Sequence, residues 1–424
     1  MLLEFRIKNF RSFRDENTLS LVASKDQDLL QANTFGLDAP VPRAVRSAVV
    51  YGANASGKSN LVRALQLMRG VVVESASLKP EQLFNVQPFR LSDDSAREPT
   101  LFEVSLALNG ERFQYGFTFT PQRIVSEWLL VYRTSKPQRW FTREFDSIKN
   151  KEVFRFGPHL NGPKTTWRDA TRPNALFLST AVQLNSEQLR PLVDWFTNSL
   201  VVLMDGGMMP FNLSTERIQN PEGHTAVRSL MEAADIGIAA ISAVRQKSVT
   251  QTFNLDLQTG KSNALTSEGE LIVPKFKHVA GDVSADFDLF DESQGTQKLF
   301  ALAGPLLDII SRGSVLVIDE LDRSLHPLLV RQIVEAFQSG APEECKAQLI
   351  FTTHDTSLLD AKLLRRDQIW LTEKRQDQSS HLIPLTEFSP RKNEALEKGY
   401  LGGRYGGVPI LGGRLISGSW RGEQ

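Results

Sequence analysis

The sequence is poor in cysteine and has no long apolar run. Its 424 residues include a single cysteine, Cys345, so no disulfide can form within the chain and a reducing compartment suits the protein. No apolar stretch is long enough to span a bilayer. Charged residues also interrupt the segment Met1–Phe10, where a signal peptide would need an unbroken apolar core. We therefore expect a cytoplasmic protein without a membrane partner.

The chain also carries no net charge. Lysine plus arginine number 49, as do aspartate plus glutamate, so the formal net charge is zero. This balance argues against a general binder of polyanions such as DNA, although a local basic patch can lie within it. The apolar and charged fractions, 41% and 23%, are those of a globular protein. The length allows one large core or two ordinary ones.

A phosphate-binding motif follows a short apolar strand predicted at residues 46–51. The pattern GxxxxGK[ST] is complete and consists of Gly52, Ala53, Asn54, Ala55, Ser56, Gly57, Lys58 and Ser59, with Asn60 next in the chain. In such a loop the backbone N–H groups and the positive end of the following helix bind phosphate oxygens. The lysine reaches the β- and γ-phosphates, and the serine hydroxyl can bind Mg²⁺. Chance matches occur, but the strand before the motif and the helical spacing after it favour a site for ATP and Mg²⁺.

Two carboxylates, Asp319 and Glu320, end another apolar strand, predicted at residues 315–318. A carboxylate at the end of a buried strand is costly without a partner. Mg²⁺ held by Asp319 would supply one, and Glu320 can polarise the attacking water as a general base. Acids are common at ordinary strand ends, so this interpretation depends on the phosphate loop.

A histidine ends a third apolar strand, predicted at residues 348–353. The side chain of His354 can hydrogen-bond the γ-phosphate and so sense whether it is present. A strand-end histidine is more often simply solvated, and the sharper interpretation rests on the order of the strands along the chain.

The remaining pattern predicts further elements on both sides of these motifs. Alternating segments predict an antiparallel sheet with a hairpin turn at Asn109–Gly110, and Pro305 predicts a kink or break in a helix that follows Gly295. A polar stretch at residues 251–269 predicts strand ends and loops, and the glycine-rich tail after Lys398 predicts a loop. The other predicted elements are strands at 2–7, 19–22, 102–108, 112–118, 124–132 and 368–371, a mostly helical stretch from about 172 to 244, and a helix at 327–337.

These motifs resemble the ABC-type ATPase heads of the SMC, RecF and OLD nuclease group. They resemble more closely the bacterial AAA-family ATPases of abortive-infection and other antiphage systems, including the ATPase of the PARIS system. The resemblance covers nearly the whole chain. Besides the phosphate loop it rests on FRIKNFRSF at 5–13, ESQGT at 292–296, IDELDRSLHP at 318–327, THD at 353–355 and GYLGGRYGG at 399–407.

The resemblance implies an α/β fold, an ABC-type P-loop ATPase head. Such a head has a mixed or parallel core sheet, an antiparallel β subdomain and a mainly helical insertion. The expected parts are an N-terminal ATPase lobe at 1–170, the helical insertion at 171–250, a C-terminal ATPase lobe at 251–390 and a glycine-rich tail at 391–424.

The resemblance also assigns roles to residues outside the phosphate loop. The segment 293–296 is similar to the ABC signature, in which Ser293 and Gly295 contact the γ-phosphate bound to the other subunit. Hydrolysis would then require a homodimer or a higher assembly that encloses two ATP molecules. A helix N-cap is the ordinary role of this tetrapeptide and is compatible with the signature role. Residues 321–324 correspond to the D-loop, Gln87 to the Mg²⁺-sensing glutamine of the Q-loop, and residues 11–13 to a segment that flanks the base.

Two departures from the group shape the predicted function. The chain is too short between the phosphate loop and the signature for the long arms of SMC proteins, and it does not continue into a Toprim nuclease after His354. Its six histidines form no HNH-like group, so any nuclease or toxin activity should belong to a separately encoded partner. We expect an ATP-hydrolysing dimeric switch of an antiphage system that controls this effector, with a phage protein as a candidate trigger. The alternatives are a RecF-like ATP-gated DNA-binding repair ATPase and an assembly scaffold in which ATP is structural.

Overall fold

A computed structural model describes most of the chain. The described residues are 1–38, 40–204, 211–234, 237–255, 262–338, 345–391 and 394–409, and their side chains are described except at 248–255 and 262–269. In this part of the chain, no helix is both long and apolar enough to cross a membrane.

The core is a six-stranded sheet in the order β11-β15-β16-β5-β17-β18. The first five strands are parallel, and β18 pairs antiparallel with β17. Every residue of β5, β15 and β16 is buried, as expected for parallel strands covered on both faces. The strands are β5 (Ser47–Gly52), β11 (Leu200–Leu203), β15 (Val315–Ile318), β16 (Gln348–Thr352), β17 (Ile369–Lys374) and β18 (Ser380–Pro384).

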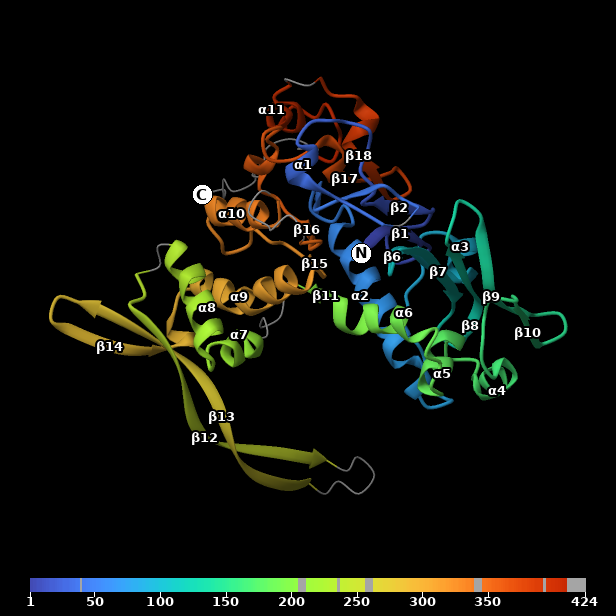
Figure 1. Ribbon diagram of the computed structural model, residues 1–424, viewed down its shortest axis with the longest axis horizontal. Helices are drawn as coiled ribbons and strands as arrows, with labels where there is room; N and C mark the ends of the chain where they lie inside the picture. The colour runs from blue at the N-terminus through green and yellow to red at the C-terminus, as the bar shows by residue number, and fades with distance from the viewer. Residues whose placement is uncertain are drawn as a thin grey trace, which may run out of the picture.

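The two faces of this sheet belong to two hydrophobic cores. Ala48 and Val50 of β5 pack in one core with α2 (Lys58–Glu74), which runs through the centre of Figure 1. Val49 and Tyr51, which alternate with them, pack in the other core with α9 (Gln294–Arg312) and α10 (Pro327–Phe337). The period-2 alternation along β5 therefore assigns neighbouring residues to opposite faces.

An antiparallel seven-stranded sheet, β10-β9-β8-β7-β6-β1-β2, shares the α2 core. The predicted sheet and its turn are confirmed, and both Asn109 (φ 51°) and Gly110 (φ 78°) have the positive φ angles that a tight hairpin turn requires. The strands are β1 (Leu2–Lys8), β2 (Asn17–Ser20), β6 (Thr100–Leu108), β7 (Glu111–Phe119), β8 (Ile124–Tyr132), β9 (Pro137–Asp146) and β10 (Lys151–Phe156), and β3 (Thr34–Gly36) pairs separately with β4 (Arg43–Val45).

The predicted α/β class is confirmed, with a mainly parallel core sheet and an antiparallel β subdomain. The order of elements along the chain also matches the expected strands at 315–318, 348–353 and 368–371 and the expected helix at 327–337. The remaining helices are α1 (Leu30–Asn33), α3 (Asp93–Arg97), α4 (Lys164–Ala170), α5 (Phe177–Gln183), α6 (Arg190–Asp194), α7 (Asn212–Arg217), α8 (Pro221–Ala233) and α11 (Leu396–Leu401).

The expected helical stretch ends at Ala233, earlier than the predicted boundary near Val244. The element that projects from the body is a ribbon of β12 (Ala240–Leu255) and β13 (Ser262–Ala280), to which β14 (Val283–Asp288) adds a third strand (Figure 1). The expected strand ends at 251–269 are confirmed, because β12 ends at Leu255 and β13 begins at Ser262, and the two strands pair from Ala240–Lys277 to Leu255–Ser262. The expected loop lies outside the described residues. The base of the ribbon packs in the second hydrophobic core through Ile241 and Phe276. Residues 244–247 and 270–271 are exposed, and exposed strands need not alternate between apolar and polar residues.

The helix α9 continues through Pro305, where a kink or break was expected. Proline has no N–H to donate to the carbonyl four residues earlier and crowds that carbonyl. The hydroxyl of Ser214, on the adjacent α7, donates to the Phe300 carbonyl at 2.5 Å and accepts the Gly304 N–H at 2.8 Å. A neighbouring helix thus supplies hydrogen bonds beside the proline, and the helix is maintained.

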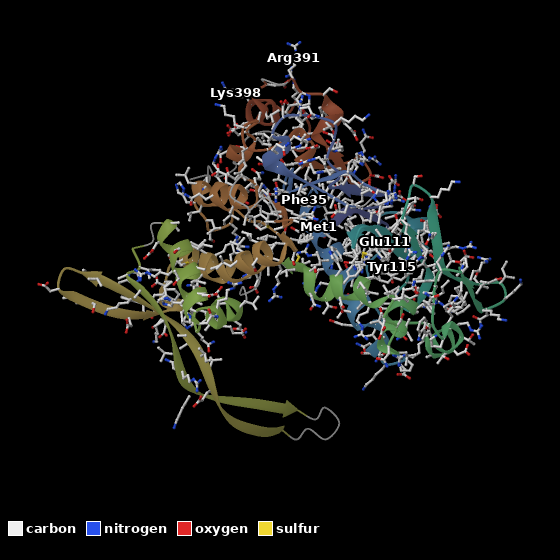
Figure 2. All side chains as sticks on the ribbon, in the orientation of Figure 1. Met1, Phe35, Glu111, Tyr115, Arg391 and Lys398 are labelled. Atoms are coloured by element: carbon white, nitrogen blue, oxygen red, sulfur yellow. The ribbon has the colours of Figure 1, made fainter. Side chains whose placement is uncertain are left out.

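A buried carboxylate connects the antiparallel sheet to α5. Glu127 is completely buried and accepts hydrogen bonds from the Tyr115 hydroxyl and from the N–H groups of Phe177 and Leu178, at 3.1, 2.7 and 3.0 Å. The equally buried Arg143 lies 3.7 Å away. Tyr115 is labelled in Figure 2, within the sheet. Burial raises the pKa of Glu127, and Arg143 and these donors oppose the rise.

We expect Glu127→Ala to destabilise the protein by about 3–5 kcal/mol, because the Tyr115 hydroxyl and the N–H groups of Phe177 and Leu178 lose their buried acceptor. Arg143 keeps its ion pair with Glu152 at 2.8 Å. Urea unfolding followed by circular dichroism measures the change. Glu144→Ala is the matched control: Glu144 is half exposed and pairs with Arg155 at 3.2 Å, so its loss should cost less than about 1 kcal/mol. Equal effects of the two substitutions would contradict this role of Glu127.

Candidate nucleotide site

Three parallel strands end side by side at the candidate site. The strand β16 lies between β5 and β15 and pairs with both in parallel register. The chain leaves β5 into the phosphate loop, β16 toward His354 and β15 into Asp319 and Glu320. Because the carboxyl ends of parallel strands meet at one edge of a sheet, the motifs predicted from separate parts of the sequence converge.

The phosphate loop has a backbone that favours glycine at both of its fixed positions. Gly52 and Gly57 have φ angles of 155° and 120°. A Cβ on Gly52 would lie 2.3 Å from the Thr372 hydroxyl oxygen, and one on Gly57 would lie 2.4 Å from the Ser380 hydroxyl oxygen. The loop therefore rests directly on β17 and β18, and any larger residue at either glycine would displace it.

Two hydroxyl contacts attach the loop to these strands. The Ser56 and Thr372 hydroxyls lie 2.6 Å apart, and the Ser380 hydroxyl oxygen lies 2.5 Å from the Ser56 carbonyl oxygen. The Asn60 side chain, in the first turn of α2, donates to the Ser12 hydroxyl at 2.8 Å. The loop is held in shape by the protein alone, before any phosphate binds.

The Lys58 ammonium is buried at the centre of the loop. It donates to the carbonyls of Gly52 and Ala53 at 2.7 and 3.2 Å. Burial lowers the pKa of Lys58, while Glu320, Asp319 and Asp322 oppose the fall. The lysine and the carboxylates that follow β15 are therefore close enough to interact, as the sequence predicted.

Thr352, the last residue of β16, orients the two predicted carboxylates. Its hydroxyl donates to the Asp319 carboxylate at 2.7 Å and accepts the Glu320 N–H at 2.8 Å. Asp319 is 2% exposed, whereas the Glu320 side chain is 34% exposed. Glu320 also has a φ of 51°, so the chain turns sharply after Asp319. Asp319 is thus shielded from water, which suits a fixed ligand of a metal ion. Glu320 has access to water, which suits a general base.

His354 lies within the electrostatic reach of the phosphate-loop lysine. Burial lowers the pKa of His354, the Lys58 charge lowers it further, and Asp322 and Asp319 oppose this. The imidazole is therefore mainly neutral at pH 7. The backbone N–H of His354 donates to the Asp322 carboxylate at 3.2 Å. This hydrogen bond connects the loop after β16 to the loop after β15.

Ser293 and Gly295, the residues of the predicted signature, lie at the start of α9. Ser293 is its N-cap, and its hydroxyl accepts the Thr296 N–H at 3.2 Å. A Cβ on Gly295 would lie 2.7 Å from the Ser324 carbonyl oxygen, and Lys298 donates to the carbonyls of Glu320 and Arg323 at 2.8 Å each. The N-cap is therefore present, and the first turns of α9 are attached to the loop predicted as the D-loop.

Gln87 lines a cavity of about 300 Å³ beside the first turn of α2, together with Arg11, Ser12, Asn60 and Lys374. Its carbonyl accepts the Arg11 N–H at 2.8 Å. Burial lowers the pKa of Arg11, and Arg63 and Arg90 lower it further. Gln87, the predicted Mg²⁺-sensing residue, thus lines the same basic cavity as Arg11 and Ser12, which belong to the segment predicted to flank the base. This cavity lies next to the phosphate loop.

Several site residues were missed in the sequence. Thr352, Thr372 and Ser380 hold the loop and the carboxylates, and Tyr51 donates its hydroxyl to the Asp355 carbonyl at 2.9 Å. Only Thr352 had a signal, because it ends the same predicted strand that leads to His354. The others depend on which strands become neighbours in space.

The predicted donors for Mg²⁺ are of the right chemical type. Ser59 offers a hydroxyl oxygen and Asp319 a carboxylate oxygen, and hard oxygen ligands are those that Mg²⁺ prefers. Thr352 already occupies one oxygen of Asp319 and leaves the carboxylate oriented. The residues present therefore fit a magnesium ion bound together with phosphates.

Comparisons with known proteins give one matching family and several distant structural likenesses. A family model described as "AAA domain, putative AbiEii toxin, Type IV TA system" matches residues 47–360. Among solved structures, the SMC head domain from Thermotoga maritima is 14% identical and has a TM-score of 0.40, with 90% of this chain and 98% of that chain covered. An Smc head bound to the C-terminal winged-helix domain of ScpA is 12% identical with a TM-score of 0.42, and the covered shares are 90% and 96%. No curated protein matches.

We expect an NMR titration to give His354 a pKa below the ordinary value near 6.5. In Lys58→Met this pKa should rise, because the substitution removes a nearby positive charge. The matched control is Lys149→Met, which removes an exposed lysine in the turn between β9 and β10 and should leave the titration unchanged. A His354 pKa that is the same in wild type and Lys58→Met would show that the two residues do not share a site.

Proposed function

This chain belongs to the AAA-domain family described for AbiEii toxins and type IV toxin–antitoxin systems, and we propose that it is an ATP-hydrolysing, dimeric molecular switch. It would act as the sensor or regulator of an antiphage defence system and control a separately encoded toxin or nuclease. The observation that carries the hydrolytic part is the convergence of Lys58, Asp319, Glu320 and His354 at the ends of three adjacent strands.

Each of these residues has a distinct part in the proposed reaction. Lys58 exchanges the carbonyls of Gly52 and Ala53 for the β- and γ-phosphates of ATP. Ser59 and Asp319 would hold Mg²⁺, which supplies positive charge beside the phosphates. The Glu320 carboxylate accepts a proton from the water that attacks the γ-phosphorus, and the bond to ADP breaks. A neutral His354 donates one hydrogen bond to the γ-phosphate.

The dimeric part of the proposal rests on the place of Ser293 and Gly295. Their contacts are with α9 and with the loop that contains Ser324, so they are available to a nucleotide bound by a second copy. The link through Lys298 to the carbonyls of Glu320 and Arg323 would couple that contact to the catalytic loop. ATP would then favour the closed dimer, because only the closed state makes both sets of contacts.

The regulatory part of the proposal draws on the family description, which names a toxin and a toxin–antitoxin system. The ribbon of β12 and β13 projects from the ATPase body (Figure 1), and it offers a surface through which a closing dimer can act on an effector. Co-purification with the product of a neighbouring reading frame tests this part, and its dependence on ATP tests the switch.

Glu320→Gln should retain ATP binding and lower steady-state hydrolysis by about 100-fold or more, the usual contribution of a general base. Phosphate release measures hydrolysis, and size-exclusion chromatography with ATP should show an accumulated dimer. Glu335→Gln is the matched control, because Glu335 is on α10 and pairs with Arg331, so this variant should hydrolyse ATP as the wild type does. Normal hydrolysis by Glu320→Gln would refute the assignment of the base.

An equal mixture of Lys58→Ala and Ser293→Arg should regain hydrolysis that each variant lacks alone. Half of the dimers would be mixed, and each mixed dimer would contain one intact composite site of two, so about one quarter of the wild-type rate is expected if exchange is random. The mixture is compared with each variant at the same total concentration. No recovery in a mixture that forms mixed dimers would contradict a signature that acts on the partner's nucleotide.

A further inference from the structure

The glycine-rich C-terminal segment, expected as a loop, packs against the base of the phosphate loop. It begins with the helix α11, at the top of Figure 1, and continues through turns to Gly407. Figure 2 shows Lys398 of this helix pointing outward, whereas Tyr400 and Tyr405 are buried, with 7% and 2% exposure. The segment is therefore part of the second hydrophobic core and not a free tail.

The Tyr400 hydroxyl lies between the phosphate loop and the end of this segment. It donates to the Gly407 carbonyl at 3.1 Å. Gly407 in turn approaches the phosphate loop, because a Cβ on it would lie 3.7 Å from the Gly52 Cα. Burial raises the pKa of Tyr400, and the nearby backbone N–H of Gly52 opposes the rise. One side chain thus bridges the first residue of the phosphate loop and the glycine-rich turn.

The backbone of the turn requires its glycines. Gly403, Gly406 and Gly407 have φ angles of 76°, 68° and 69°, which are left-handed values that other residues rarely adopt. A Cβ on Gly407 would lie 3.7 Å from the Gly52 Cα and 3.6 Å from the Tyr400 ring. A Cβ on Gly407 would make only ordinary contacts, so it is the left-handed backbone of the turn, and not lack of space at Gly407, that favours glycine there.

The same helix also contacts the loop that follows His354. The rings of Tyr400 and Tyr51 pack with centroids 5.5 Å apart, and the Tyr51 hydroxyl donates to the Asp355 carbonyl at 2.9 Å. The Thr356 hydroxyl donates to Glu397 of α11 at 2.8 Å. The C-terminal segment thus spans two of the three loops of the candidate site.

We propose that Tyr400 is a positioning residue of the phosphate loop, which it holds through Gly52 against the glycine-rich turn. The Gly52 carbonyl is now bound by Lys58, and this bond must break when the lysine moves to the phosphates. The Tyr400 hydroxyl then keeps the first residue of the loop in place, so the loop does not have to be ordered by the nucleotide. This inference rests on the proposed function, because it assumes that ATP binds at the loop.

The test is Tyr400→Phe in the full chain, with ATP binding and hydrolysis measured. The phenylalanine ring keeps the packing on Tyr51 and removes only the hydroxyl. Loss of one hydrogen-bonded bridge should raise the Kd and KM for ATP by about three- to tenfold, while kcat at saturating ATP changes by less than about twofold. Thermal unfolding is recorded in parallel.

The matched control is Tyr405→Phe, which removes a tyrosine hydroxyl from the same segment. The Tyr405 hydroxyl donates to Glu394, so this variant should bind ATP as the wild type does even if its Tm falls equally. Equal affinities of Tyr400→Phe, Tyr405→Phe and wild type would overturn the inference and leave the proposed function standing. A wild-type protein that neither binds nor hydrolyses ATP would overturn the proposed function itself.

Gly407→Ala is a second variant, which disturbs the contact of Tyr400 with the glycine-rich turn by changing the turn. Alanine is strained at a φ of 69° and should displace the turn from Gly52 and Tyr400. We expect the same rise in KM for ATP. If Tyr400→Phe does not fold, a wild-type KM for a folded Gly407→Ala would overturn the inference.

Discussion

The parallel register of β5, β16 and β15 is the constraint on which the candidate site depends. A hydrogen-bonded register aligns the carboxyl ends of neighbouring strands within a fraction of a residue, so the loops that follow must meet. The Thr352 hydroxyl adds a direct bond between the ends of β16 and β15, since it contacts both Asp319 and Glu320. The site is therefore rigid at its base, and its chemistry is carried by residues one or two positions beyond each strand.

The other side of the phosphate loop is held by elements that carry no recognised motif. Thr372 of β17 and Ser380 of β18 occupy the space that a Cβ on Gly52 or Gly57 would need, and α11 adds the contact with Tyr400. The C-terminal region thus completes a cradle whose first half comes from the N-terminal lobe. The phosphate loop and these C-terminal strands lie in direct contact, which is why residues 52 and 57 have no room for a Cβ.

Local patterns in the sequence located the loops that meet at the candidate site. The phosphate loop, Asp319 and Glu320, and His354 were predicted because each follows a short apolar strand, and buried parallel strands read as continuous apolar runs. Thr372, Ser380 and Tyr400 could not be predicted, because their roles depend on strand neighbours that no local pattern reveals. The extent of the ribbon of β12 and β13 was not predicted for a related reason: its exposed residues, such as 244–247, need not show the alternation by which strands are recognised.

The charges of the candidate site indicate how a chain without net charge would bind a triphosphate. Three carboxylates, those of Asp319, Glu320 and Asp322, act on Lys58, so these four side chains together are negative before the triphosphate adds more negative charge. The positive end of α2 and the loop amides offset part of this repulsion, and a divalent cation at Ser59 and Asp319 would offset more. In the proposed function, ATP would therefore bind together with a cation, and the nucleotide and Mg²⁺ would act as a single ligand in electrostatic terms. The carboxylates would repel ATP alone and would therefore favour its magnesium-bound form.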